Sequence, residues 1–152
     1  MKRGLANGLL AGIIATVPMT VAMEVGRRSG LLRHQPPEQI TDRLLTVAGT
    51  TNTPRDQREG IAGLVHLATG ATLGAIFAAL PRPKRLTARL GLGTAYGLAV
   101  YTFNYAGLAP RMRLMPPPSQ DRPGRQLTTF ASHLVFGTTL GCLLGPATKN
   151  GG

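Results

Sequence analysis

The chain has 152 residues, of which 17 are Lys or Arg and 6 are Asp or Glu, giving a formal net charge of +11. This length suits one domain, residues 1–152. The basic balance would suit a nucleic-acid surface, but Trp is absent and aromatic residues make up only 5% of the chain, so stacking platforms are scarce. The basic residues lie instead between long uncharged runs, which favours a bilayer with anionic headgroups as the partner and no nucleic acid.

Four uncharged runs predict the architecture. Each lacks Asp, Glu, Lys and Arg and approaches the roughly 20 residues that a helix needs to cross about 30 Å of hydrocarbon. We therefore expect an all-α, polytopic membrane protein with four transmembrane helices. These helices are expected at about residues 4–25, 60–80, 89–108 and 126–145.

The first expected helix carries a small or polar residue at every fourth position. This series runs from Gly4 through Gly8, Gly12, Thr16 and Thr20 to Glu24. Such a stripe lets helix backbones approach closely without a hydrophobic force between them. Pro18 is expected to kink this helix. Although the basic start resembles a signal peptide, the run is long and lacks a small-residue cleavage site before Glu24, so we expect a retained helix.

The segments between the helices are polar. The loop at 26–59 contains a short amphipathic helix at about 37–48, in which Ile40, Leu44 and Val47 share a face. We expect it to lie on the bilayer surface or on the end of the bundle. Pro110 is expected to end the third long helix, and the loop at 109–125 is proline-rich and therefore stiff and extended.

The second and fourth helices share a nine-residue motif. Residues 66–74 and 133–141 both read His-Leu-x-x-Gly-x-Thr-Leu-Gly, and the first and third helices each contain a GxxxG pair. This pattern predicts a helical hairpin used twice, as a parallel repeat about an axis along the membrane normal. The alternative is coincidence between glycine-rich helices. The expected packing residues are Gly8, Gly12, Gly70, Gly74, Gly93, Gly97, Gly137 and Gly141.

Four polar residues are expected at one level of the bundle, toward the long loops: Glu24, His66, Asn104 and His133. Polar groups in a membrane usually face a bundle interior and find partners there. The two histidines could ligate haem, hold a metal with the carboxylate, relay protons, or simply bond a neighbouring helix and fix its register. Close glycine packing argues against haem, and three ligands without tight spacing argue against a metal, so we expect neither cofactor nor metal.

Motifs of soluble enzymes are missing from the sequence. It contains no P-loop, no nucleophile elbow and no HExxH, and Cys142 is its single cysteine. We therefore expect no enzymatic activity. The first hypothesis is a structural or accessory membrane protein whose glycine stripes close its own bundle or dock a second copy or another membrane protein. The alternatives are a small transporter or proton-conducting module using Glu24, His66 and His133, and a haem- or metal-binding membrane subunit.

The order of several segments resembles the YagU-like family of bacterial inner-membrane proteins. The segments are GLLAGIIATVPMTVAMEVG, QPPEQITDRLL, LVHLATGATLGAIF, GLGTAYGLAVYTFNYAGLAP and SHLVFGTTLG. The resemblance covers most of the chain and implies a multi-pass protein of the bacterial inner membrane, with no catalytic residue to carry over. The short, densely basic segments on the side of the two termini lead us to expect both termini in the cytoplasm.

Overall fold

The computed structural model describes residues 2–32, 36–47, 49–50, 52–113 and 117–147, and contains no β-strand among them. The all-α class predicted from the sequence is therefore confirmed. Along the chain, the elements are α1 (Lys2–Arg28), α2 (Pro36–Val47), α3 (Arg55–Ala79), α4 (Leu86–Tyr101), the π-helix η1 (Thr102–Leu108), α5 (Ala109–Arg111), the 3₁₀ turn η2 (Pro118–Gln120) and α6 (Pro123–Leu143). Two of the described helices, α1 over Gly4–Arg28 and α3, are long and apolar enough to cross a membrane.

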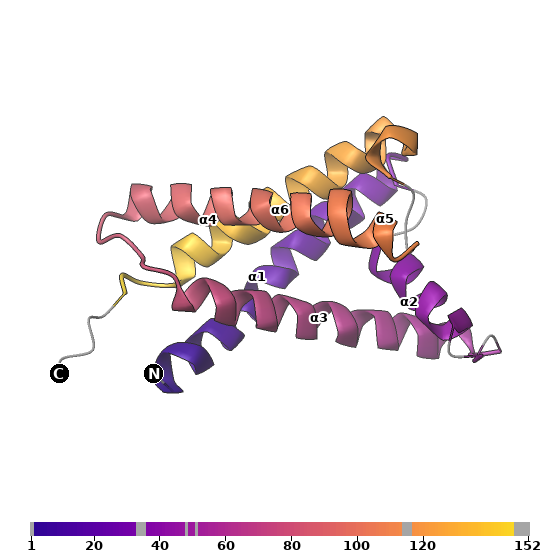
Figure 1. Cartoon of the computed structure of the whole chain (residues 1–152), viewed down its shortest axis with the longest axis horizontal. Coiled ribbons are helices and arrows are strands. Elements are labelled where there is room, and N and C mark those ends of the chain that lie inside the picture. Colours follow the sequence, from indigo (N-terminus) through magenta and orange to yellow (C-terminus); the bar gives the residue numbers. More distant parts are fainter. Residues whose placement is uncertain (1, 33–35, 48, 51, 114–116, 148–152) are drawn as a thin grey trace.

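The long helices run alternately back and forth along the longest axis of the molecule (Figure 1). The start of α1, the turn between α3 and α4, and the end of α6 lie at one end of the molecule, with α2 and α5 at the other. At the first end, Arg82 joins two segments: its Nε donates to the carbonyl oxygen of Gly145 at 2.9 Å, and its Nη1 donates to the carbonyl oxygen of Ala78 in α3. Arg82 thus caps α3 and holds the segment that follows α6.

Glycines bring α1 against α3. A Cβ atom added at Gly8 would lie 2.8 Å from the carbonyl oxygen of Gly74, and one added at Gly12 would lie 2.9 Å from the Cα atom of Ala71. A Cβ at Gly70 would collide with the side chain of Thr16. No side chain fits between these two backbones, so the small residues of both helices determine how closely they approach.

Glycines bring α4 against α6 in the same manner. A Cβ added at Gly93 would lie 2.9 Å from the backbone nitrogen of Gly141, and one added at Gly137 would lie 2.7 Å from that of Gly97. All eight glycines singled out in the sequence therefore lie at contacts within the chain. These contacts close the bundle itself and leave those glycine faces covered.

The helices separate toward the end that carries α2. There α1 leaves α3 and packs on α6, where a Cβ at Gly26 would lie 2.7 Å from Oγ1 of Thr128. Figure 1 shows α2 lying across the wide end of the resulting wedge, beside α3. Within α2, Ile40 packs on Tyr105 and Ala109, whereas Val47 remains 76% exposed. The face predicted for this helix is therefore divided between the bundle and the outside.

The third long helix continues past its expected end. Pro110 was expected to stop it, but the helix passes from α4 through the π-helix η1 into α5 and ends at Arg111. The backbone N–H of Ala109 donates to the carbonyl oxygen of Asn104, five residues earlier. The wider π turn makes room for the proline ring, which would collide with the carbonyl of an ordinary α turn.

Parts of the expected loops lie outside the described residues: 33–35, 48 and 51 in the first, and 114–116 in the second. The end of the predicted amphipathic helix at residue 48 is among them. The described part of that helix, α2, spans Pro36–Val47.

Candidate functional site

An inner pocket of about 260 Å³ lies in the wedge between the helices. Three of the four polar residues singled out in the sequence, His66, Asn104 and His133, line it together. Its walls come from α1, α3, α4, η1, α5 and α6, and Ile40 of α2 contributes to its end. The remaining lining residues are Thr16, Met19, Met23, Val65, Thr69, Gly70, Leu73, Val100, Tyr105, Leu108, Ala109, Thr129 and Phe136.

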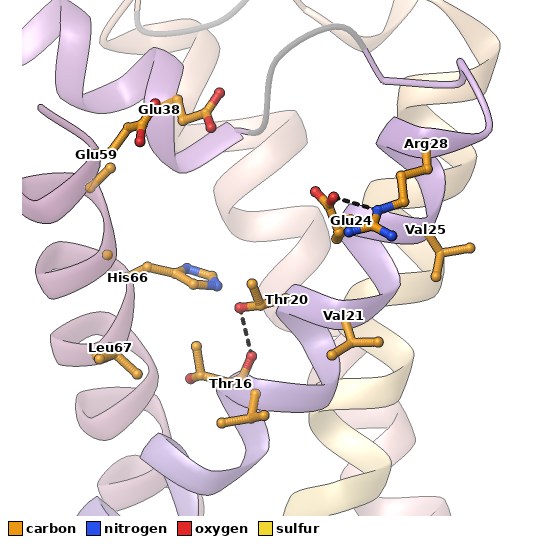
Figure 2. A pocket seen from close by; sticks show the side chains of 13 residues that line it. Thr16, Thr20, Val21, Glu24, Val25, Arg28, Glu38, Glu59, His66 and Leu67 are labelled. Carbon is orange, nitrogen blue, oxygen red and sulfur yellow. Dashed lines mark hydrogen bonds and ion pairs between the residues drawn. The ribbon is translucent and has the colours of Figure 1, made fainter. Parts of the chain in front are cut away.

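An outer pocket of about 780 Å³ lies on the other side of His66, between α1 and α3. Figure 2 shows the imidazole of His66 reaching from α3 toward Thr20 on α1, with the carboxylates of Glu38 and Glu59 farther toward α2. Glu24, the fourth residue of the predicted layer, lines this outer pocket. His66 and Thr16 line both pockets, so the imidazole stands between them.

Glu24 is held by arginines of its own helix. Its carboxylate accepts from Nε of Arg27 at 2.6 Å and from Nε of Arg28 at 2.8 Å, and its side chain is 28% exposed. The ion pair with Arg28 is drawn in Figure 2. Glu24 therefore forms part of a charged rim, in a different pocket from His133 and Asn104.

His133 is anchored within α6. Its Nδ1 lies 2.8 Å from the carbonyl oxygen of Thr129, which can only accept, so this nitrogen carries the proton and Nε2 is left as an acceptor. The ring of Tyr101 packs edge-on against the imidazole, with centroids 5.7 Å apart. His133 is 9% exposed, and its ring is fixed in orientation by a bond on one side and an aromatic ring on another.

Two residues that line the inner pocket each carry a buried side-chain atom with no hydrogen-bond partner: Nε2 of His66 and Oγ1 of Thr129. Thr129 is only 3% exposed. Its backbone carbonyl accepts a hydrogen bond from His133, but its side-chain hydroxyl has no partner. Buried polar atoms are rarely left without partners in native proteins, because they have lost water without a replacement. These two groups mark the inner pocket as a place where a further hydrogen-bonding molecule would be stabilised.

Asn104 reaches the inner pocket from the π-helix. The π turn places Asn104 and Leu108 in the lining, together with Tyr105. Stretches of π-helix are rare and are found mostly at functional sites, since they change which residues face inward. The sequence singled out Asn104 by its depth in the helix and contained no recognisable signal for the π turn.

An acidic network beside the pocket was missed by the sequence reasoning. The hydroxyl of Tyr105 donates to Oδ2 of Asp121, whose Oδ1 lies 2.9 Å from Nε of Arg125. The Asp121 side chain is 1% exposed. One signal was present in the sequence, because Asp121 is the single acidic residue after Glu59. Thr16 and Thr129 were hidden among the small residues of the stripes.

The described residues contain no cluster of three or more His, Cys, Asp or Glu side chains that could hold a metal ion. The inner pocket is lined by no Asp, Glu, Lys or Arg among those residues, whereas the outer pocket has three carboxylates and Arg28. The two pockets therefore suit different molecules: the inner one suits a neutral group, and the outer one presents a charged rim. In comparisons with known proteins, the chain matches no protein family, no curated protein and no solved structure.

Proposed function

We propose that the chain is a multi-pass integral membrane protein in which α1, α3, the continuous helix α4–η1–α5 and α6 all cross the bilayer. In this proposal, it is a non-enzymatic structural or accessory protein, and its glycine stripes close its own bundle. The YagU-like resemblance supports the bacterial inner membrane as its location. Both termini are assigned to the cytoplasm, since the start of α1, the end of α6 and the basic turn from Arg82 to Arg85 share one end of the molecule.

The observation that carries this proposal is the apolar outer surface of the long helices. Glycines and small polar residues share the interior with apolar side chains such as Phe77 and Leu140, and large apolar side chains also cover the outside of the long helices. Those exposed by at least 40% include Leu10, Ile14, Val17, Val21, Leu64, Ile76, Leu98, Phe103 and Leu127. The core helix of a soluble protein would be mostly buried, but only 39% of the apolar window in α1 and 22% of that in α3 is buried. A surface of this kind requires lipid or a large apolar partner.

The packing also supports a repeated hairpin. In the first pair, Gly12 meets Gly70 and Gly8 meets Gly74; in the second, Gly97 meets Gly137 and Gly93 meets Gly141. The glycines occupy the same positions of the shared motif in both pairs. We therefore propose that α1–α3 and α4–α6 are two copies of one helical hairpin in the same orientation.

A second candidate function is proton or solute conduction. It is favoured by one observation, that His66 lies between an outer pocket with a charged rim and a neutral inner pocket that also contains His133. Replacing both histidines with Gln is expected to abolish flux into liposomes if this function holds. Unchanged flux would remove both side chains from the pathway.

Cysteine labelling in native membranes tests the membrane proposal. In a Cys142→Ser background, single cysteines at Val21, Leu64, Leu98 and Ala131 sample the four helices, and a cysteine at Arg85 samples the turn. A membrane-impermeant maleimide is expected to modify the Arg85 position from one side only and to leave the helix positions unmodified until the protein is denatured in detergent. Modification at Leu98 and Ala131, with protection at Val21 and Leu64, would reduce the protein to two spans.

A further inference from the structure

The inner pocket has the composition of a binding site for a small apolar molecule. Apolar side chains such as Met19, Met23 and Phe136 line it from α1 and α6, and no charged side chain lies among its described lining residues. A charged ligand would lose its hydration there without compensation. The pocket therefore selects neutral molecules with a largely apolar body.

Its unpartnered atoms specify what else such a molecule must carry. Oγ1 of Thr129 can donate one hydrogen bond, and Nε2 of His66 can donate or accept one, depending on the tautomer. A carbonyl or hydroxyl oxygen on the ligand would satisfy the threonine, and a hydroxyl would also suit the imidazole. Asn104 supplies a further donor and acceptor in the same lining. Oxygen substituents on an apolar body complement this set.

The volume limits the size of the body to about one ring. An apolar cavity of roughly 150 Å³ can hold a benzene molecule, and the inner pocket measures about 260 Å³. A benzene ring with several small substituents therefore fits within the pocket, while a large fused-ring system would extend beyond it.

The position of the pocket indicates how a ligand would reach it. The hydroxyl of Tyr96 on α4 donates to the carbonyl of Leu73 on α3 at 2.8 Å, which joins the two helices at one end of the pocket. Beyond that bond, the lining includes Val65 of α3 and Leu108 of η1, which are 39% and 42% exposed. Both residues lie on the apolar outer surface, so this side of the pocket borders the region that the proposed function assigns to lipid.

We infer that the inner pocket binds a neutral, lipid-soluble, single-ring molecule with oxygen substituents, of the benzoquinone or phenol class. Thr129 Oγ1 and His66 Nε2 bond its oxygens, and Met19, Met23 and Phe136 enclose its ring. The inference that the ligand enters from the bilayer rests on the proposed function, whereas the inference that the pocket binds it does not.

Two methionines make the binding measurable at the pocket itself. Met19 and Met23 line the pocket and are 7% and 1% exposed, whereas Met112 is 54% exposed and lies outside the lining. The full chain, labelled with ¹³C at the methionine methyl groups, is titrated in detergent micelles with tetramethyl-1,4-benzoquinone. We expect saturable shifts of the Met19 and Met23 signals and little change at Met112. Tetramethylbenzene, which has the same six-carbon ring skeleton and methyl groups but is aromatic and lacks oxygen, is the control ligand and is expected to bind about 3- to 10-fold more weakly.

Matched variants assign the recognition to the named atoms. Thr129→Val removes the unpartnered hydroxyl and is expected to weaken quinone binding about 3- to 10-fold while leaving tetramethylbenzene binding unchanged. Thr72→Val removes a hydroxyl that is bonded to Ala68 outside the pocket and should change neither affinity. Ala109→Leu fills the pocket and should abolish both shifts.

Three results would each overturn the inference: no shift of Met19 and Met23 up to the solubility limit, equal affinity for the two ligands, or an unchanged quinone affinity in Thr129→Val. If the Thr129→Val protein loses its native spectrum, Thr129→Ala takes its place, because it also removes the hydroxyl. It should weaken quinone binding more than tetramethylbenzene binding, and equal changes for the two ligands would overturn the inference. Because the titration is done in micelles, saturable binding together with failed membrane protection would refute only the membrane proposal and the bilayer as source. Membrane protection without binding would refute only the ligand.

Discussion

The two helical pairs, α1–α3 and α4–α6, carry the same glycine motif, but the surroundings of the histidine in that motif differ between them. In α4–α6, His133 is bonded to Thr129 and packed against Tyr101. In α1–α3, His66 lies between two pockets with Nε2 unpartnered. Gly97 and Gly12 occupy equivalent places, and the fourth residue after each is Tyr101 in one pair and Thr16 in the other. A ring covers one histidine, whereas a short hydroxyl leaves space beside the other.

This comparison shows that two helical pairs with similar glycine contacts can have different surroundings beside their histidines. The glycines set the approach of the helices in both pairs, so the framework is shared. The side chain one turn further along decides whether the histidine is packed or left facing a pocket. The second pair then supplies the other wall, because Thr129, His133 and Asn104 all face the same inner pocket as His66.

The largest expected effect comes from breaking the shared framework. Gly74→Leu in the first pair or Gly141→Leu in the second forces a side chain against the opposing backbone, where even a Cβ would lie 2.5 Å from Gly12 Cα or 3.1 Å from Leu90 Cα. Each should cost about 3 kcal/mol of stability, since the helices must separate. Thermal unfolding in detergent and size-exclusion chromatography measure the loss.

Gly91→Leu is the matched control for these two variants. A Cβ at Gly91 meets nothing within 4 Å, although Gly91 lies in α4 two residues before Gly93. It should unfold at nearly the temperature of the unmodified protein. A Gly141→Leu protein as stable as Gly91→Leu would show that the second pair does not depend on glycine contact.

The next largest effect is expected from a substitution at the wide end of the second pair, compared with one at the wide end of the first. In the second pair, Asp121 joins Tyr105 and Arg125 with its side chain 1% exposed, while α2 lies beside α3 of the first pair. Asp121→Asn leaves Arg125 without its buried counter-charge and should destabilise the protein by about 3 kcal/mol. Asp56→Asn, at an exposed site in the first turn of α3, should change stability by less than about 0.5 kcal/mol. Chemical unfolding monitored by tyrosine fluorescence compares the two; equal midpoints would contradict the role assigned to Asp121.

Much of the framework could be predicted because it depends on local patterns. Uncharged runs located the long helices, and glycines at fourth-residue spacing marked the faces that meet. His66, Asn104 and His133, which the sequence placed at one level, line one pocket, since depth along a helix follows from a fixed rise per residue. Cysteine labelling tests the proposal that all four helices span a membrane.

The remaining features depend on non-local contacts. Glu24 lies at the expected depth but faces a different pocket from His133, because α1 turns it toward the outer side and its neighbours Arg27 and Arg28 bind it. The π turn at Asn104 and the continuation of the helix beyond Pro110 arise from a wider backbone turn that no residue type announces. The partnerless state of Thr129 depends on which atoms of other helices come near it.

Giving His133 surroundings like those of His66 should lower the stability of the protein moderately. Tyr101 contacts Tyr105, Phe130 and His133 through ring pairs with centroids 5.1 to 5.7 Å apart. Tyr101→Thr places the residue of the first pair in the second and should destabilise the protein by about 2 kcal/mol, because a packed ring is lost and space opens beside His133. Phe103→Thr removes a ring that is 66% exposed and should leave the bundle contacts intact. Differential scanning calorimetry in micelles separates the two; equal losses would show that the aromatic cluster does not distinguish the pairs.

The smallest expected effect is a gain in stability on removing the Thr129 hydroxyl, which has no hydrogen-bond partner. Thr129→Val keeps the shape of a buried residue and removes an oxygen that makes no hydrogen bond. Stability should therefore stay the same or rise by up to about 1 kcal/mol, because the cost of burying an unpaired polar atom disappears. Thr94→Val is the informative comparison, since the Thr94 hydroxyl bonds Thr138 across α4 and α6 at 2.8 Å and its removal should lower stability by about 1 kcal/mol. Thr129→Val could instead lower the unfolding temperature as much as Thr94→Val does. The Thr129 hydroxyl would then already have a hydrogen-bond partner in the folded protein and would not be available to bond a ligand.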